Sequence, residues 1–538
     1  MKMKIFTVLV EKGSKQMTTQ DQELDKIKKE MALQHIKELS EQSSAHTSIY
    51  EKLTEEQQEF IKNHRFPGAG PLEVDEEPLS IEISFEEWLH ILQKKYDNLF
   101  QMVKENLPNL SPSLDFEISI QKILNIKECS LPFAGIVLGR PSSFKTVGIE
   151  LFRKWKNVFY TDNFSARAFV SHTTTISKDK LAQIDLLPKI KNKLFLTPEL
   201  SPTFAKKDEE LIEILGIMTR VLDGQGYESD TGAHGHRGYT GPHMFVWIGA
   251  AVDIPWKVHK YLATLGPKLY FLRLPHADKT EDEYLDEMNH DNFHVKVIAV
   301  KESLYDYLNW FEKCPHAIFE NGVPKIAWDN RRNDQNTLRM IIRLAKLLGH
   351  LRCVVPTRET KDSHSQGIDY AYTMATPEDP SRARTQLKNL ARGHGLSQGR
   401  NYITADDILL VIQVVMSTAS IERVSMFELL IENKGKLSTS QVAKSLNTSA
   451  ITAKRTMREF EALGLVYVIE TEYDNEEKTI VLKEEFNWFL SDEFLNLKQK
   501  CRKNFTPLVV GKILHNRSVP ETGQRGHNSY SMNTHSER

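Results

Sequence analysis

The chain has 538 residues, of which 40% are hydrophobic and 26% are charged, and its formal net charge at pH 7 is -2. This length predicts several domains, and the balance of charge excludes a strongly basic or acidic overall field, so that any contact with nucleic acid has to come from local basic patches. The four cysteines form no CxxC pair, which argues against a zinc knuckle and a disulfide framework. No apolar run reaches the length of a membrane span, and we expect a cytoplasmic protein without membrane contact.

The first 112 residues precede the region in which strands and helices alternate. Residues 1–66 are rich in charged side chains, and we expect a partly helical or disordered arm. Pro67-Gly68-Ala69-Gly70-Pro71 indicates a linker at the start of a region 67–112. That region contains a predicted helix from Phe85 to about Glu105, with Ser84 as its N-cap.

Residues 113–300 carry apolar, strand-like runs that alternate with helical patterns. This alternation predicts an α/β domain with a largely parallel sheet flanked by helices. The expected strands are Gly135–Leu138, Val158–Tyr160, Lys193–Thr197, Met244–Ile248, Lys268–Leu272 and Val295–Val300.

A phosphate-binding pattern follows the first of these strands. The segment Gly139-Arg140-Pro141-Ser142-Ser143-Phe144-Lys145-Thr146 stands between the strand and a predicted helix, as in a P-loop. In a P-loop, backbone N–H groups cradle phosphate, a Lys reaches the β- and γ-phosphates, and a Ser/Thr hydroxyl holds Mg²⁺. We therefore predict ATP and Mg²⁺ as cofactors, with Thr146 on the metal. The predicted nucleotide contacts are Gly139, Pro141, Ser142, Ser143, Phe144, Lys145 and Thr146.

Phe144 departs from the pattern, which has Gly before the Lys so that the backbone can adopt an unusual conformation near the phosphate. Phe144 either distorts the loop or points outward over the nucleotide. The alternative to a P-loop is a buried strand and turn that carry these residues by chance.

A second apolar strand ends in an acid at Glu199. We predict that Glu199 is the catalytic general base that orients or deprotonates the attacking water. Pro198 replaces the Asp that usually holds Mg²⁺ through water, which leaves the metal to Thr146 or to a neighbour such as Asp162. The alternative is that Glu199 only caps the next helix.

The segment from Gly224 to Gly241 is too rich in glycine for a regular strand or helix, and we expect a functional loop or hairpin with Arg237 and Tyr239 at its tip. A metal site is an alternative, but no Cys or well-placed carboxylate completes a ligand set for the histidines. A surface loop without a role is another. The histidines concerned are His234, His236 and His243.

Helical patterns dominate residues 301–420, with expected helices at Asn336–Leu351, Ser381–Ser397 and Ala405–Ser417, apart from a polar, loop-like stretch at 356–380. Residues 421–490 show three helices and then two strands, Val466–Thr471 and Thr479–Leu482, which predicts a winged helix. Its third helix carries a basic face suited to DNA, although winged helices also bind proteins. The residues on this face are Thr452, Lys454, Arg455 and Arg458. Residues 491–538 are expected to be a disordered basic tail.

Two segments within 301–420, Asp379-Pro380-Ser381-Arg382-Ala383-Arg384 and residues 399–408, resemble the helical lid of the MoxR, Mg-chelatase and MCM-helicase branch of AAA+ ATPases. The resemblance implies an AAA+ core over about 113–300 with a lid over 301–420. It implies that Arg382 senses the γ-phosphate (sensor 2) and that the strand Phe245–Ile248 holds the sensor 1 site. Lys268 or Arg273 is implied as the arginine finger that acts across a subunit boundary, and Arg237 as a contact to DNA in a central channel.

These observations together predict an AAA+-like ATPase that acts on DNA, as an MCM-like helicase, translocase or replication-associated ATPase. The expected assembly is a homo-oligomer, with a hexameric ring as one form. The departures at Phe144, Pro198 and Lys268 weaken catalysis. A non-hydrolysing, nucleotide-gated DNA-binding adaptor and a transcription regulator are therefore the alternatives.

Overall fold

The computed structural model describes residues 83–504 apart from short gaps at 173–176, 233–234, 267, 276–279, 290–291, 316, 362–367 and 470–476. The predicted arm, most of the predicted linker and the end of the tail lie outside the described residues. Every described residue belongs to one compact unit that begins at Glu82.

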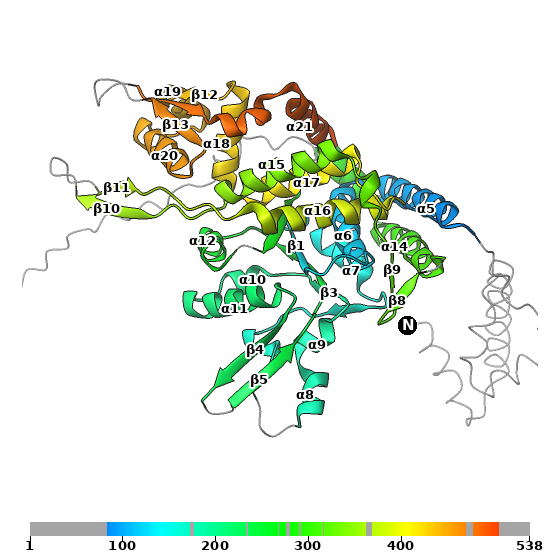
Figure 1. Ribbon diagram of the computed structural model, residues 1–538. Coiled ribbons are helices and arrows are strands. Elements are labelled where there is room, and N and C mark those ends of the chain that lie inside the picture. Colours follow the sequence, from blue (N-terminus) through cyan, green and yellow to red (C-terminus); the bar gives the residue numbers. More distant parts are fainter. Residues whose placement is uncertain are drawn as a thin grey trace, which may run out of the picture. The chain divides into compact units, whose positions relative to one another are not determined.

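A five-stranded parallel sheet forms the centre of this unit (Figure 1). The strands, in spatial order, are β2 (Val158–Tyr160), β3 (Leu194–Thr197), β6 (Val246–Ala251), β1 (Phe133–Leu138) and β7 (Leu269–Arg273). All pairs of neighbours run parallel. β1, β3 and β6 are buried at every position, as expected for parallel strands with helices on both faces. The predicted α/β class with a parallel sheet is confirmed.

Alternate residues of β1 enter two different hydrophobic cores. Phe133 and Val137 face the core shared with the helices α5 (Phe85–Asn106), α6 (Ser111–Ile123) and α16 (Pro380–Ser397). Ala134 and Ile136 face the core shared with α11 (Asp208–Val221) and α12 (Trp256–Leu265). A side chain at Gly135 would collide with α6, since its Cβ would lie 2.2 Å from Ile120, so this glycine allows α6 to pack directly on the strand. α6 was not predicted from the sequence.

The sixth predicted strand is wrong, because Val295–Val300 lies in the helix α14 (Phe293–Trp310). Its β-branched residues favour a strand locally, but Val300, Leu304 and Leu308 recur at helical spacing and are buried. α14 packs beside α5, where the Nε1 of Trp88 donates a hydrogen bond to the carbonyl of Trp310. The predicted boundary between core and lid at 300/301 therefore falls inside one helix.

Residues 301–420, the predicted lid, contain three buried helices, α15 (Gln335–Leu351), α16 and α17 (Ile408–Thr418), close to their predicted positions. We call these residues the lid for their position only. Between α15 and α16, the stretch predicted as a loop forms a hairpin of β10 (Thr357–Lys361) and β11 (Ile368–Tyr372), which projects from the lid helices in Figure 1. α17 covers the edge of the sheet, where the hydroxyl of Thr418 accepts a hydrogen bond from the N–H of Phe271.

A buried ionic network fixes the end of α16. His394 lies 2.6 Å from Asp407 and 3.5 Å from Asp115, and Arg400 donates two hydrogen bonds to Asp407. Burial alone would lower the pKa of His394, but the two carboxylates raise it to about 10. The imidazole is therefore a permanent cation at neutral pH, and Asp115 on α6 joins the lid to the core.

Residues 421–482 form three helices and a small antiparallel sheet. The helices are α18 (Ile421–Glu432), α19 (Thr439–Ser445) and α20 (Ala450–Ala462), and the sheet order is β12 (Lys436–Ser438), β14 (Thr479–Leu482) and β13 (Val466–Ile469). The three helices and two strands of the prediction are present, and β12 was not predicted. The buried Arg423 holds this part to the lid, because its guanidinium donates to the carbonyls of Leu351 and Cys353.

The tail begins with a helix rather than the predicted disorder. α21 (Asp492–Asn504) buries Phe494 and Cys501, so residues 491–504 contribute to the core. The rest of the tail lies outside the described residues.

The other helices are α7 (Lys145–Phe152), α8 (Lys178–Ile184), α9 (Leu186–Ile190), α10 (Ser201–Phe204) and α13 (Glu281–Asn289), and the other strands are β4 (Gly226–Thr231), β5 (Gly235–Thr240), β8 (Ile318–Glu320) and β9 (Val323–Lys325). None of the helices among the described residues has the length and apolar character needed to cross a membrane.

Candidate nucleotide-binding site

The predicted P-loop connects the end of β1 to the start of α7. Ser142 and Phe144 both have left-handed backbones, with φ of 64° and 63°, and α7 begins at Lys145. Phe144 thus adopts the type of conformation for which the P-loop pattern uses glycine, although an L-residue pays about 1–2 kcal/mol to do so. Its ring is partly buried against Phe293 at the start of α14, with 5.9 Å between the ring centroids.

The start of the loop is sterically tight. A Cβ on Gly139 would lie 2.3 Å from the Oγ of Ser143 and 3.1 Å from its Cβ, so a side chain here would force the Ser143 hydroxyl to move. The Oγ of Ser143 is buried and has no hydrogen-bond partner among the described residues. A phosphate oxygen bound in the loop would supply such a partner, and the donor set of the loop therefore fits an anionic ligand.

Lys145 and Glu199 meet at the carboxyl edge of the sheet. Lys145 is 6% exposed, and its Nζ lies 3.8 Å from the Oε2 of Glu199. The Oε1 of Glu199 accepts a hydrogen bond from the N–H of Ser201 at the start of α10. The contact with the next helix that the sequence offered as the alternative is therefore present, while the other carboxylate oxygen faces Lys145. The side chain of Glu199 is 39% exposed, which leaves it accessible to water.

Thr146 is exposed in the first turn of α7, as a metal-binding hydroxyl would have to be. One helical turn later, Glu150 lies 2.6 Å from the hydroxyl of Tyr160, which also lies 2.9 Å from Asp162. Burial and the two carboxylates raise the pKa of Tyr160 above its ordinary value. Asp162 is therefore on the side of α7 that carries Thr146, and Thr146 with Asp162 could help to hold Mg²⁺ beside bound phosphates. The described residues contain no group of three or more His, Cys, Asp or Glu side chains that could hold a metal alone.

Arg273 lies at the same edge as the P-loop. It ends β7 and is in register with Leu138, the last residue of β1 before the loop. Its Nη1 donates to the Oδ1 of Asp253 at 3.1 Å, and Asp253 follows the predicted sensor 1 strand. β6 contributes no polar side chain at its buried carboxyl end, so Asp253 is the nearest acid that follows this strand.

Lys268 and Arg382 lie at the opposite end of the strands, the amino end, where they share the carboxylate of Asp223. The Nζ of Lys268 donates to the Oδ1 of Asp223 and to the carbonyl of Thr219, both at 2.6 Å, and Arg382 forms an ion pair with the same Oδ1. Burial would raise the pKa of Asp223, but these two cations bring it below its ordinary value.

The pair of Lys268 and Arg382 and the predicted P-loop are separated by the length of a strand. Lys268 precedes β7 and Arg273 ends it, and five residues of extended chain span about 17 Å. The structure therefore brings Lys268 and Arg382 together, but it does not bring them to the predicted P-loop of the same chain. The sequence could not show this pairing, because Asp223 was not identified as a site residue.

The glycine-rich segment is a hairpin, which is one of the two forms expected, but the prediction that it is too rich in glycine for regular strands is wrong. β4 and β5 pair from Gly226↔Thr240 to Thr231↔Gly235. Glycine is needed at Gly238, where a Cβ would lie 2.3 Å from the carbonyl oxygen of Tyr227. Tyr239 lies near the base of the hairpin, where its hydroxyl donates to Asp185, and not at the tip as predicted.

Arg237 is opposite Ser229 in the middle of the hairpin, and not at its tip as predicted. Its neighbour His236 lies 3.0 Å from Glu228 and 3.2 Å from Asp230, and these two carboxylates raise the pKa of the imidazole. His243 is buried beside the carbonyl of Gly241, which leaves it far from forming a ligand set with His236. His234 lies outside the described residues.

The predicted basic face of α20 is partly covered. Lys454, Arg455 and Arg458 are half-buried, and Thr452 and Ile451 are exposed, Ile451 by 66%. Ala375, which follows β11, donates its N–H to the carbonyl of Ala462 at the end of α20. This helix thus presents a mixed polar and apolar surface rather than a purely basic one.

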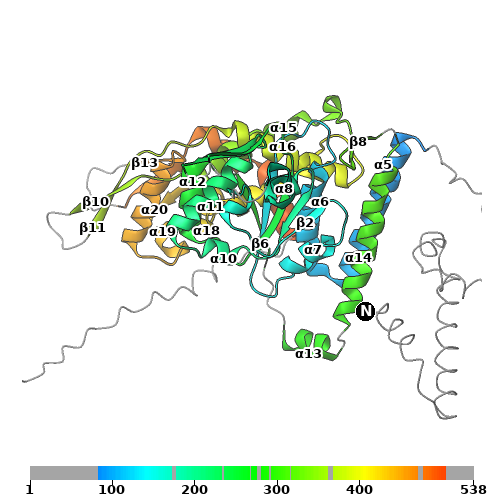
Figure 2. The ribbon, with the colours of Figure 1, turned by 90° about the horizontal axis from the view of Figure 1, so that it is seen from below.

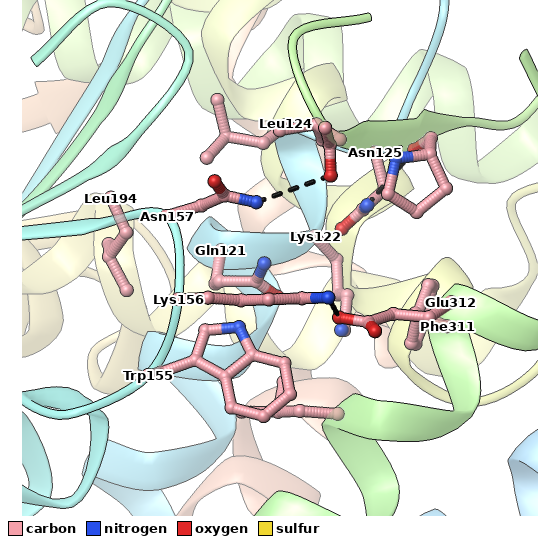
Figure 3. Close-up of a pocket in the computed structure, with 14 residues that line it drawn as sticks. Gln121, Lys122, Leu124, Asn125, Trp155, Lys156, Asn157, Leu194, Phe311 and Glu312 are labelled. Carbon is pink, nitrogen blue, oxygen red and sulfur yellow. Dashed lines mark hydrogen bonds and ion pairs between the residues drawn. The ribbon is translucent and has the colours of Figure 1, made fainter. Parts of the chain in front are cut away.

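A small cavity lies away from the P-loop, behind the start of β3 (Figure 3). Its volume of about 30 Å³ suits a single water and excludes a nucleotide. The buried Lys122 lines it, with the ammonium 3.3 Å from the ring centre of Phe311, and burial lowers the pKa of this lysine. Figure 3 shows Lys156 and Glu312 meeting across the cavity as an ion pair. No pattern in the sequence indicated this cavity, and its size indicates a structural role.

Comparison of the chain with known protein families and with curated proteins finds no match.

Proposed function

We propose that this protein is a P-loop ATPase of the AAA+ type that couples ATP to DNA. The observation that carries the proposal is the meeting of Lys145 and Glu199 at the carboxyl edge of the sheet, beside a loop with an unpartnered buried hydroxyl. In this proposal Lys145 binds the β- and γ-phosphates, Thr146 holds Mg²⁺, and Glu199 orients the attacking water. Arg273 and Asp253 frame the same edge.

The proposed assembly is a head-to-tail homo-oligomer, with a hexameric ring as one form. Lys268 and Arg382 lie about one strand length from the P-loop of their own subunit, so they would act on the nucleotide of a neighbouring subunit. Lys268 lacks the planar fork of an arginine, which predicts a smaller contribution to the stabilisation of developing charge.

The proposed contacts to DNA come from two places. The β4–β5 hairpin carries Arg237 and projects from the sheet in Figure 1. Residues 421–482, with helices α18 to α20 and the sheet β12-β14-β13, support a winged helix, in which Lys454, Arg455 and Arg458 on α20 would contact phosphates. The four free cysteines suit a reducing compartment, and a cytoplasmic location is part of the proposal.

The first test measures the affinity of the full chain for a fluorescent ATP analogue. Lys145→Ala is expected to abolish binding, because it removes the buried cation of the loop. Lys154→Ala, which changes an exposed lysine just beyond α7, is the matched control and is expected to bind normally. Unchanged affinity in Lys145→Ala would overturn the assignment of the P-loop.

The second test measures phosphate release with and without single- and double-stranded DNA, beside Glu199→Gln. DNA-stimulated release that is lost in Glu199→Gln supports a DNA-coupled ATPase. A second candidate function, a non-hydrolysing nucleotide-gated DNA-binding adaptor, is favoured by the engagement of Glu199 with Ser201 and by Pro198 in place of an acid. ATP binding without turnover would establish that candidate and exclude the first.

A further inference from the structure

A basic groove lies between α15, α16 and the segment that leads into β1. Its volume is about 380 Å³, and we call it the lid groove. Arg384, Lys388 and Arg392 line one side at successive turns of α16, and Leu131, Leu338 and Ile342 line the other. α15 and α16 carry no acidic residue, so Glu128 is the only acid in the lining of this groove.

The end of the groove holds a cation that lacks part of its hydrogen bonding. Arg392 is 7% exposed and donates from Nη2 to Asn330 at 3.0 Å, but its buried Nε has no partner among the described residues. A buried donor without a partner is rare in a folded protein, and it indicates that an acceptor binds there. The groove is therefore built for a ligand that is both anionic and apolar.

Helix α13 has the complementary composition. Its nine residues read EDEYLDEMN, with five acids and no base. Tyr284, Leu285 and Met288 share one face of the helix and are 53%, 57% and 78% exposed. Figure 2 shows α13 standing clear of the other labelled helices. An acidic helix with an exposed apolar face needs a basic, partly apolar partner.

We propose that α13 of one copy docks in the lid groove of a second copy. The lengths agree, since the nine residues of α13 span about 13 Å and the eight steps from Arg384 to Arg392 span about 12 Å. In the docked complex Leu285 and Met288 cover Leu338 and Ile342, and the acidic helix lies along the three bases of α16.

The two surfaces lie at opposite ends of β1. The lid groove includes Leu131, just before the strand. α13 ends four residues before Phe293, which contacts the P-loop after the strand, and four residues span at most about 14 Å. Contact between the two surfaces therefore joins copies head to tail, with the P-loop edge of one copy beside the Lys268 and Arg382 edge of the next. The inference rests on the proposed function only for this order of subunits.

DNA is a poorer occupant of the lid groove. The sugar-phosphate backbone offers no apolar group to Leu131, Leu338 and Ile342. An acidic helix with exposed Leu and Met satisfies both halves of the lining.

The test measures self-association of the full chain by sedimentation equilibrium, with the ATP analogue present. We expect Leu285→Ser with Met288→Ser to raise the dissociation constant at least tenfold, and Lys388→Glu to do the same. The combined variant is expected to weaken association about as much as either change alone, because both remove one contact. Controls are Ile318→Ser with Phe319→Ser, which changes exposed apolar residues elsewhere, and Lys104→Glu, which reverses an exposed charge on α5.

Unchanged association in the α13 and groove variants, or a monomeric wild-type protein, would overturn the inference. Lower DNA affinity of Lys388→Glu with unchanged association would assign the groove to DNA instead and would also overturn it. The ATP analogue separates this inference from the proposed function, since the variants leave the P-loop intact and should bind the analogue normally. A wild-type protein that associates through these surfaces but binds no analogue would contradict only the proposed function.

Discussion

The ring of Phe144 lies 5.9 Å from the ring of Phe293, while the backbone of Phe144 remains left-handed at φ 63°. The aromatic contact and the unusual backbone occur in the same residue, directly before the P-loop lysine. The loop therefore keeps a glycine-like path without glycine, because packing against α14 offsets the backbone strain.

Replacement of Phe144 separates these two effects. Phe144→Ala loses the ring contact and keeps the strain, whereas Phe144→Gly loses the contact and relieves the strain. We expect the Gly variant to be more stable than the Ala variant by about 1 kcal/mol in urea denaturation. Phe144→Gly should bind the ATP analogue at least as tightly as the wild type. Equal stability of the two variants would show that the backbone is not left-handed in solution.

Removal of the Asp223 carboxylate should destabilise the fold, because it leaves Lys268 and Arg382 to repel each other. Asp223→Ala leaves Lys268, whose side chain is 10% exposed, beside Arg382 without a counter-charge. We expect a loss of about 2 kcal/mol in the free energy of unfolding, measured by chemical denaturation. Arg220→Ala is the matched control, because Arg220 pairs with the same carboxylate but is 57% exposed, and it should cost less than about 0.5 kcal/mol.

A buried acid beside α7 predicts a specific dependence on pH. Glu117 is fully buried, neither oxygen has a hydrogen-bond partner among the described residues, and burial raises its pKa well above the ordinary 4.5. Above pH 4.5 the folded state holds a proton that the unfolded state releases, so stability falls as pH rises, by at most about 1.4 kcal/mol per pH unit.

Glu117→Gln removes this dependence. The variant and the wild type should have similar stability near pH 4, and the variant should be the more stable one at pH 8. Thermal denaturation across this range measures the difference. A constant offset between the two proteins at all pH values would contradict a protonated Glu117.

The network around His394 also makes stability depend on pH, but here the groups that stabilise the folded state are charged. Asp407→Asn removes the main partner of His394 and Arg400, and we expect a loss of about 3 kcal/mol. The His394 contribution is complete below pH 6.5 and is lost as the pH rises through its folded pKa of about 10. The Asp407 contribution is lost as the pH falls through a folded pKa that lies below 3.8. The difference in stability between variant and wild type should therefore be largest between about pH 4 and 6.5. It should narrow towards pH 10, where only the pairing of Asp407 with Arg400 remains.

The elements that the sequence predicted correctly are those whose local pattern and packing agree. β2 was predicted at its observed bounds, and α15 and α16 within one residue. In the two helices, buried apolar residues recur at a regular period. The segment that joins β1 to a helix and carries Lys145 was likewise predicted from a fixed local spacing. The first part of α14 was wrongly predicted as a strand because its β-branched residues favour that conformation. Its helical conformation is stabilised by packing against α5.

Long-range relationships were beyond the sequence. The pairing of Lys268 with Arg382 depends on Asp223, and these residues are far apart along the chain. The glycines of the β4–β5 hairpin are needed for close approach of backbones, as at Gly238, but in sequence they resemble those of an irregular loop. The burial of Glu117 depends on α6, which no pattern revealed.

α14 has one further consequence. Its 18 residues form a rod about 27 Å long, which starts at the P-loop through Phe293 and ends at α5, where Trp88 packs against Phe311. A tilt of about 5° at the P-loop end would displace the far end by about 2 Å, by the geometry of a rod of this length. α14 is thus placed as a mechanical lever. It would transmit a movement of the loop to α5, the first helix of the compact unit.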